Sequence, residues 1–228
     1  MKPKLKHLNR RILFGITGKS ASECISKIKE LDALGERRAA LFLEMLTPVH
    51  RRRVYSALKK SGLKEFPLVH IRNDMKKEEL KYLEENYGAK HFTIHESSFA
   101  YLGKWQGYHH KLYLELNYDN HVPESVAVEL IGGFCIDLSH FKSSEERWTR
   151  DFEYVMRHKN KKGRFECNHL NGYSETAKKD IHTVRSLAEF DYLKSLPKFI
   201  FGEEIALEVF NPVSEQVLFK KHVVKMLS

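Results

Sequence analysis

Acidic and imidazole side chains stand at the ends of apolar stretches in this sequence, and residues 133–140 give the clearest example. Apolar and polar residues alternate along this stretch up to Asp137, and His140 follows three residues later. The pattern predicts a buried strand that ends in a carboxylate, with an imidazole close by. A buried carboxylate is costly unless a cation compensates for its lost hydration, so Asp137 is a candidate metal ligand. The alternative is that Asp137 only caps the helix that follows.

Other apolar stretches end in the same way. In residues 112–116 the three leucines share one face, whereas Tyr113 and Glu115 share the other. Because strand side chains alternate between two faces, such strands can pack their apolar faces outward while their ionisable ends converge. The strand ends that form this set are Glu44, His70, His95, Glu115, Asp137, His169 and Glu208. Mixed imidazole and carboxylate ligands favour zinc, manganese or iron over calcium or magnesium.

Apolar runs and turn residues predict strands that alternate with helices along the whole chain. The strands are expected at residues 12–16, 39–46, 66–71, 91–95, 112–116, 133–137, 164–169 and 205–209. Helices are expected at residues 20–34, 48–58, 74–86, 123–131, 143–158 and 186–197, and from Pro212 onward. This alternation implies parallel pairing and predicts an α/β fold, a (β/α)₈ TIM barrel. We expect a single domain over residues 1–228, slightly shortened because residues 101–110 lack a helical period.

The composition indicates the cellular location and the class of binding partner. The chain of 228 residues is 42% hydrophobic, enough for one sizeable core, and its formal net charge is +9. Such a charge suits an anionic partner, such as nucleic acid or a phosphorylated metabolite. The cysteines Cys24, Cys135 and Cys167 are odd in number and widely spaced, which favours reduced thiols and a cytoplasmic location. No apolar run approaches the ~20 residues that a membrane helix needs, and no protein partner can be inferred.

The strand-end residues resemble a known pattern, that of the xylose-isomerase-like TIM barrels. Within them, the chain looks most like the family-2 AP endonucleases (endonuclease IV) and the UV damage endonucleases. The resemblance rests on His at the third and fourth strand ends, Glu at the fifth, Asp-x-x-His at the sixth, His at the seventh, Asp-Ile-His after it and Glu at the eighth. It implies nine metal ligands, namely His70, His95, Glu115, Asp137, His140, His169, Asp180, His182 and Glu208. The implied cofactor is one to three divalent ions, with zinc or manganese favoured.

The resemblance implies a metal-dependent hydrolase, a phosphodiesterase of the DNA repair endonuclease type. A metal-bound hydroxide would attack the phosphodiester, with Glu115 and Glu208 as the catalytic carboxylates. The alternative is a sugar or sugar-phosphate isomerase or epimerase of the same superfamily, in which Glu115 and Glu208 would pass a proton. A third reading is a barrel that only binds. The chain departs from the nuclease pattern at Gly172, where an Asp is expected, and at Cys167, where the UV damage branch has a Lys.

The expected substrate is DNA or a phosphorylated sugar, and basic residues that follow strands could contact its phosphates. The candidates for the rim of the site are Arg51, Arg52, Arg53, Arg72, Lys104, Lys142, Lys178, Lys179 and Arg185. Aromatic residues in the same loops could stack on bases or sugars, or simply pack the loops. The predicted substrate contacts are Arg51, Arg72, Lys104 and Tyr173. We further expect His140, Asp180 and His182 to share one ion, unless Asp180 is a solvated residue before a helix.

Overall fold

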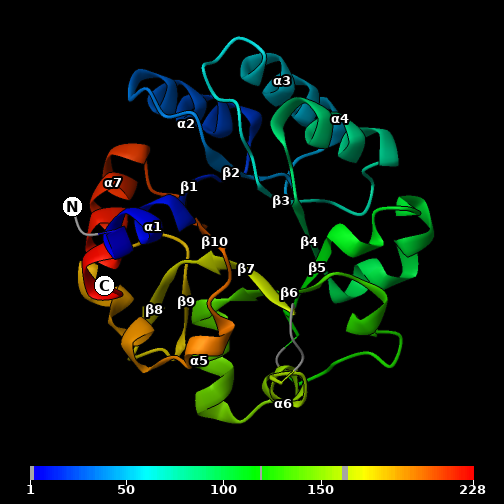
Figure 1. Cartoon of the computed structure of the whole chain (residues 1–228), viewed down its shortest axis with the longest axis vertical. Helices are drawn as coiled ribbons and strands as arrows, with labels where there is room; N and C mark the ends of the chain where they lie inside the picture. The colour runs from blue at the N-terminus through cyan, green and yellow to red at the C-terminus, as the bar shows by residue number, and fades with distance from the viewer. Residues whose placement is uncertain (1–2, 119, 161–163) are drawn as a thin grey trace.

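Eight parallel strands close into a barrel in the order β1-β10-β7-β6-β5-β4-β3-β2 (Figure 1). The computed structural model describes residues 3–118, 120–160 and 164–228. The barrel strands are β1 (Ile12–Ile16), β2 (Ala39–Phe42), β3 (Leu68–His70), β4 (His91–His95), β5 (Leu112–Glu115), β6 (Gly133–Asp137), β7 (Phe165–Leu170) and β10 (Glu204–Leu207). The predicted TIM barrel is therefore confirmed, and each predicted strand overlaps an observed one.

Helices surround part of the barrel. They are α1 (Pro3–Arg11), α2 (Ala21–Ala33), α3 (Pro48–Leu58), α4 (Lys77–Tyr87), α5 (Leu138–Arg147), α6 (Arg150–Arg157) and α7 (Val213–Met226). In the described parts of the other connections, 3₁₀ turns replace α-helices, at Glu96–Trp105, His109–Lys111, Val128–Leu130, Leu187–Ser195 and Lys198–Ile200. These replacements explain the short chain. No helix in the described ranges is long and apolar enough to cross a membrane.

Local sequence signals start and stop several of these helices where they were expected. The hydroxyl of Ser20 accepts a hydrogen bond from Glu23 N at the start of α2, as an N-cap should. Thr47 caps α3 in the same way, and Pro48 occupies the first turn, where its missing N–H costs nothing. Gly88 ends α4 with a φ of 62°, a left-handed conformation that glycine adopts without strain.

The barrel-facing side of the strands carries two layers of side chains. The lower layer is apolar and forms a cluster separate from the outer core: Leu13, Ala40, Phe42, Leu68, Tyr113, Cys135, Cys167 and Ala206. Two residues further along six of these strands, the same face carries ionisable groups: Glu44, His70, Glu115, Asp137, His169 and Glu208. Because side chains alternate along each strand, the apolar layer and the ionisable layer lie one above the other along the barrel axis.

Several predicted helices differ from the observed ones. Helix α5 begins at Leu138 rather than at residue 143, because Asp137 caps it by accepting hydrogen bonds from the amides of Ser139 (2.9 Å) and His140 (2.8 Å). The predicted single helix to residue 158 is broken at Trp148, whose φ is 54°. Of the helix predicted at 123–131 only Val128–Leu130 forms, since Val128 N donates to the hydroxyl of Tyr154 instead of a carbonyl one turn earlier.

The segment after β7 is the largest departure from the sequence prediction. It forms an antiparallel hairpin of β8 (Gly172–Ser174) and β9 (Lys179–Ile181), in which Tyr173 pairs with Asp180. The hairpin packs against α5. The predicted helix at 186–197 is a 3₁₀ segment, and its buried Phe190 and Leu193 have the spacing of three that such a helix repeats.

Candidate metal centre

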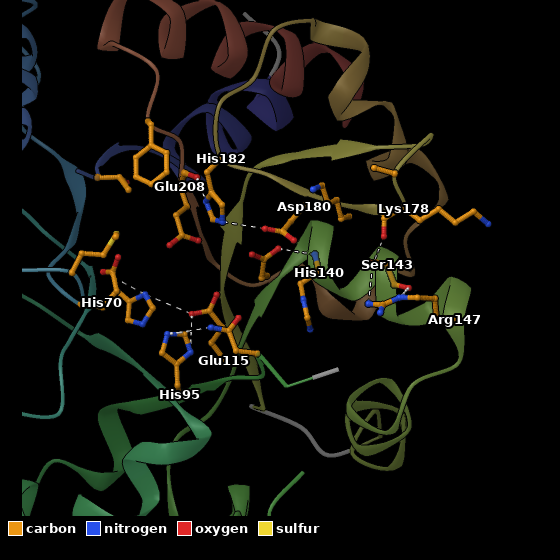
Figure 2. Close-up of a pocket in the computed structure, with 18 residues that line it drawn as sticks. His70, His95, Glu115, His140, Ser143, Arg147, Lys178, Asp180, His182 and Glu208 are labelled. Atoms are coloured by element: carbon orange, nitrogen blue, oxygen red, sulfur yellow. Dashed lines mark hydrogen bonds and ion pairs between the residues drawn. The ribbon is translucent and has the colours of Figure 1, made fainter. Parts of the chain in front are cut away.

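A cavity of about 780 Å³ opens at the carboxyl ends of the barrel strands (Figure 2). In a TIM barrel this is the end at which active sites form. Acidic and imidazole side chains dominate its lining: Glu44, His70, His95, Glu115, Asp137, His140, Asp180, His182 and Glu208. His169 lies completely buried among them.

Six of the nine predicted ligands come together in this cavity. They form three overlapping groups whose candidate ligand atoms all lie within 4.8 Å of one another. The groups are His70, His95 and Glu115; His70, His169 and Glu208; and Glu115, Asp137 and Glu208. His70, Glu115 and Glu208 each belong to two groups, so the described residues form one continuous cluster able to hold a divalent metal.

The first group has separations that suit a shared ion. Glu115 Oε2 lies 3.6 Å from His70 Nδ1 and 3.7 Å from His95 Nδ1. Two ligands bound at about 2.0–2.1 Å to one zinc ion are at most ~4.2 Å apart. Glu44 Oε2 lies 3.7 Å from His70 Nδ1 and extends the group on its β2 side. These atoms are too far apart for hydrogen bonds to one another but close enough to coordinate the same ion.

His169 links the first group to the second. Its Nδ1 lies 2.8 Å from Glu115 Oε1 and 3.4 Å from Glu208 Oε2, while its Nε2 lies 3.3 Å from the Thr93 hydroxyl. The imidazole is therefore held from both sides, with one ring nitrogen directed at two carboxylates.

Unpartnered polar atoms test whether this cluster fits a metal. Five of the buried atoms without a hydrogen-bond partner in the described residues belong to this cluster: Glu44 Oε2, both ring nitrogens of His70, His95 Nδ1 and Glu115 Oε2. Buried polar groups are normally hydrogen-bonded, and each exception needs an explanation. All of these residues line this cavity, where cations would bind the carboxylate oxygens and one ring nitrogen of each histidine. The residues present fit a divalent metal.

The protonation of the cluster agrees with this fit. Burial, and the nearby imidazoles of His95 and His169, hold the pKa of His70 well below its usual range, so this ring is a neutral donor. Burial, together with the charges of Glu208 and Glu115, raises the pKa of Glu44 to about 8. Burial opposes protonation of His169, but Cys135 and the carboxylates of Glu115 and Glu208 raise its pKa well above the usual value. Without a bound cation, protons on Glu44 and His169 thus reduce the net negative charge of the cluster.

Asp137 caps helix α5, the alternative that the sequence left open, and it also belongs to the third candidate metal-holding group. Its Oδ1 caps α5, and its Oδ2 accepts a hydrogen bond from Asn171 Nδ2 at 2.9 Å. Asn171 is completely buried and also accepts a hydrogen bond from the hydroxyl of Ser139. The carboxylate is therefore fixed in orientation while it contributes a ligand atom to the third group.

The other three predicted ligands do not join one ion. In the part of the chain that the structure describes, no metal-holding group contains His140, Asp180 or His182. His140 Nε2 lies 3.1 Å from the buried Asp151, on α6. His182 Nε2 lies 3.1 Å from Asp180. Burial would lower the pKa of His182, but the Asp180 hydrogen bond and the charges of Glu208 and Asp137 raise it to about 10.

The four predicted substrate contacts are corrected by the structure, because none of them lines the cavity. Arg51 is 1% exposed, and its guanidinium pairs with Glu79 and Asp74 at 2.9 Å. Arg72 lies 3.6 Å from Asp74.

Lys104 and Tyr173 are likewise engaged elsewhere. Lys104 Nζ donates to the carbonyl of Asn73 and lies over the ring of Tyr101. Tyr173 is buried, and its hydroxyl donates to Glu146 at 2.9 Å. Both residues follow strands, as predicted from the sequence, but their side chains contact other parts of the protein and not the cavity.

Some residues of the cavity were missing from the predicted site. Glu44 ends a strand and belongs to the strand-end set, yet the family pattern assigned it no role. Lys178 and Lys179, two of the expected rim cations, do border the cavity. Thr17, Asn117, Ser143 and Arg147 also line it. Arg147 carried no sequence signal, because it falls inside the helix predicted at 143–158 and only the break at Trp148 brings it to the end of α5.

Comparison with known proteins assigns this chain to no family. No protein-family model matches the sequence, and no curated protein matches it. Among solved structures, the crystal structure of the HpcH/HpaI aldolase from Desulfitobacterium hafniense DCB-2 is similar to this chain. The match covers 100% of this chain and 96% of that chain, at 11% sequence identity and a TM-score of 0.46.

The comparison corrects the family prediction. The resemblance to xylose-isomerase-like barrels, endonuclease IV and the UV damage endonucleases is wrong as an assignment, since the matching barrel is an HpcH/HpaI aldolase and no family model supports the other. The physical reason is that histidines and carboxylates at strand ends are what a metal-binding TIM barrel places there, whatever its reaction. The more specific motif, Asp-Ile-His at 180–182, begins in the second strand of a hairpin.

Proposed function

We propose that this protein is a metal-dependent phosphoester hydrolase that uses two divalent ions. The observation that carries the proposal is the number of converging donors. A catalytic zinc site uses about three protein ligands and keeps one position open. Six side chains in three overlapping groups therefore exceed the needs of one ion. Paired ions that share a ligand are typical of phosphatases and nucleases.

The donors divide into two sets around a shared carboxylate. His70, His95 and Glu115 would hold one ion, and Asp137 and Glu208, which form a group with Glu115, would hold the other, with His169 beside Glu115 and Glu208. When bound, such ions would polarise a phosphoryl oxygen and activate water at neutral pH. Zinc or manganese suits this mixture of imidazole and carboxylate.

The chain's own residues supply orientation and a low-dielectric setting. Asp137 is fixed by the first turn of α5 and by Asn171, so its direction is set before substrate arrives. His169 is held between Thr93 and Glu115. The apolar layer beneath, with Phe42 packed against the ring of His169 at 5.0 Å, seals the floor of the site from water. In such a setting charge–charge interactions are stronger than in bulk water.

Hydrolysis of bis(p-nitrophenyl) phosphate by the zinc- or manganese-loaded protein tests the proposal. We expect turnover that chelation abolishes, and losses of at least a hundredfold in His95→Ala and Glu208→Gln, because each change removes a donor from one set. Glu203→Gln, a similar change next to the amino end of β10, is the matched control and should keep the wild-type rate. An isomerase would show no phosphoester cleavage, and that result would replace the proposal.

A further inference from the structure

Within the described residues, one sector of the ring of strand ends carries no ionisable side chain. Seven of the eight barrel strands have such a group at or just beyond their carboxyl end: Glu44, His70, His95, Glu115, Asp137, His169 and Glu208. Strand β1 is the exception, because Gly15 and Thr17 follow the inward-facing Leu13 at the spacing of two that keeps to one face. Since β1 lies between β10 and β2 in the closed barrel, this gap falls between Glu208 and Glu44.

Two large apolar side chains of the cavity wall flank this gap. Among the described residues of the lining, they are Met45, which follows β2, and Phe210, which follows β10. Thr17 lies between them at the end of β1 and also lines the cavity. We call these three residues the uncharged sector. The candidate metal ligands come from β3 to β7 and from β10, so the uncharged sector borders the metal cluster without belonging to it.

Phe210 is fixed beside the metal cluster, whereas Met45 is exposed. The amide of Phe210 donates to the His182 carbonyl at 2.6 Å, and the two rings lie 5.7 Å apart. His182 Nδ1 is 3.1 Å from the carbonyl of Glu208, which connects the ring of Phe210 to the end of β10. Lys19 Nζ lies 5.0 Å from the centre of the same ring. Met45 keeps 43% of its surface exposed, so a ligand in the cavity can cover it.

We infer that the uncharged sector binds a flat ring in the organic part of the substrate. The inference rests on the proposed hydrolysis, which places the phosphate at the ions and the esterified alcohol beside them. A ring in this position would remove apolar surface of Met45 and Phe210 from water. It could pack against the ring of Phe210 in an offset or edge-on arrangement, and a thioether sulfur also contacts aromatic rings favourably. Aryl groups and nucleobases both offer such a ring.

Phosphate monoesters of primary alcohols, paired with and without a flat ring, test the inference. Benzyl phosphate and methyl phosphate form one pair, and thymidine 5′-phosphate and 2-deoxyribose 5-phosphate form the other. Calorimetry measures binding to the metal-loaded protein, and release of inorganic phosphate measures kcat/KM. We expect the ring to improve binding roughly tenfold or more in at least one pair. The pair that shows this gain identifies the source of the ring.

Cyclohexylmethyl phosphate separates a flat ring from an apolar group of similar size, and we expect it to bind less tightly than benzyl phosphate. In the protein, Phe210→Leu and Met45→Ser should reduce the preference for the ring toward one while the metal content stays at the wild-type level. The matched control is Leu218→Ser, which changes a side chain on α7 that is 55% exposed and lies outside the cavity. This variant should keep the preference.

Two results would overturn the inference while the proposed hydrolysis stands. One is a wild-type protein that treats the members of both pairs alike in binding and in rate. The other is equal binding of cyclohexylmethyl phosphate and benzyl phosphate, together with no gain for thymidine 5′-phosphate. A protein that binds the ring-bearing esters more tightly through Met45 and Phe210, but cleaves none of them, would retain the inference and reject the hydrolysis.

Discussion

His169 Nδ1 lies 2.8 Å from Glu115 Oε1, although the two residues belong to strands β7 and β5, which β6 separates. This contact is possible because both side chains point to the barrel axis at the same level. It joins the imidazole-rich side of the cavity to the carboxylate-rich side. A centre with two ions would depend on this contact between His169 and Glu115, because Glu115 belongs to both candidate sets of ligands.

Metal binding should stabilise the fold measurably. A ligand that binds only the native state at a hundred times its Kd adds about 2.7 kcal/mol to the free energy of unfolding. For a chain of this length that corresponds to a rise in Tm of roughly 5–10 °C. Thermal unfolding of chelated and zinc-loaded protein measures the shift, and identical melting curves in both conditions would argue against a metal centre.

Glu115→Gln should destabilise the metal-loaded protein more than the chelated protein. In the chelated protein, the change relieves repulsion from Asp137 and Glu208, but it also removes the charge that faces His169 at 2.8 Å and raises the pKa of that imidazole. In the metal-loaded protein, the change removes a metal ligand as well. Denaturant unfolding in both conditions measures the two losses. An equal loss in both conditions, or an equal effect in the Glu203→Gln control, would contradict the prediction.

Arg51 should matter for stability and not for substrate. Its buried guanidinium pairs with Glu79 and Asp74, so Arg51→Met removes the buried cation that both carboxylates face and should cost about 2 kcal/mol or more. Arg52, its exposed neighbour on α3, gives the matched control, and Arg52→Met should stay within about 0.5 kcal/mol of wild type. Activity per folded molecule should be unchanged in both, and a raised KM in Arg51→Met alone would restore its predicted role in binding.

The buried side chain of Lys27 should make the free energy of unfolding depend on pH. It is 4% exposed on α2, and its Nζ donates to the carbonyl of Val209, the residue after Glu208. Burial lowers the pKa of Lys27 from 10.5 to about 8 in the folded state. Between these values the unfolded chain binds more protons than the folded chain, so stability rises with pH across that window and the burial cost is fully present below pH 8.

The comparison of wild type with Lys27→Met isolates this effect from other groups that titrate in alkali. The free energy of unfolding of wild type relative to the variant should increase from pH 8 to pH 10.5, by up to about 3 kcal/mol. A difference that does not change with pH would mean that Lys27 titrates normally in the folded protein.

The barrel could be predicted from sequence because strands alternate with helices along the chain, and the inward ionisable layer could be predicted because side chains alternate along each strand. His70, His95, Glu115, Asp137, His169 and Glu208 were found in this way, and the structure brings them together. The same argument contains no information about loops. The conformation of each connection depends on contacts between distant segments. An example is the hydrogen bond from the Ser143 hydroxyl to the Lys178 carbonyl, which links helix α5 to the β8–β9 hairpin.

Side-chain direction in the connections was equally out of reach. Arg51 and Lys178 both follow barrel strands, and both were candidates for the rim of the site. Arg51 turns inward to Glu79 on α4 and to Asp74 in the turn before α4, because both acids lie beside α3. The hairpin turn, with a φ of 50° at Lys178, directs that side chain toward Glu146. The carboxylates of Glu79, Asp74 and Glu146 are distant in sequence from the cations that they bind. No local sequence pattern therefore predicts these ion pairs.

The number of metal ions bound per chain tests the central claim most directly. Elemental analysis of protein loaded with zinc or manganese and freed of excess ion should give two ions per chain. His95→Ala and Glu208→Gln should each retain about one, since each change removes a donor from one set only. A single ion in wild type, lost completely by either change, would contradict a two-ion centre, and no ion at all would contradict a metal centre.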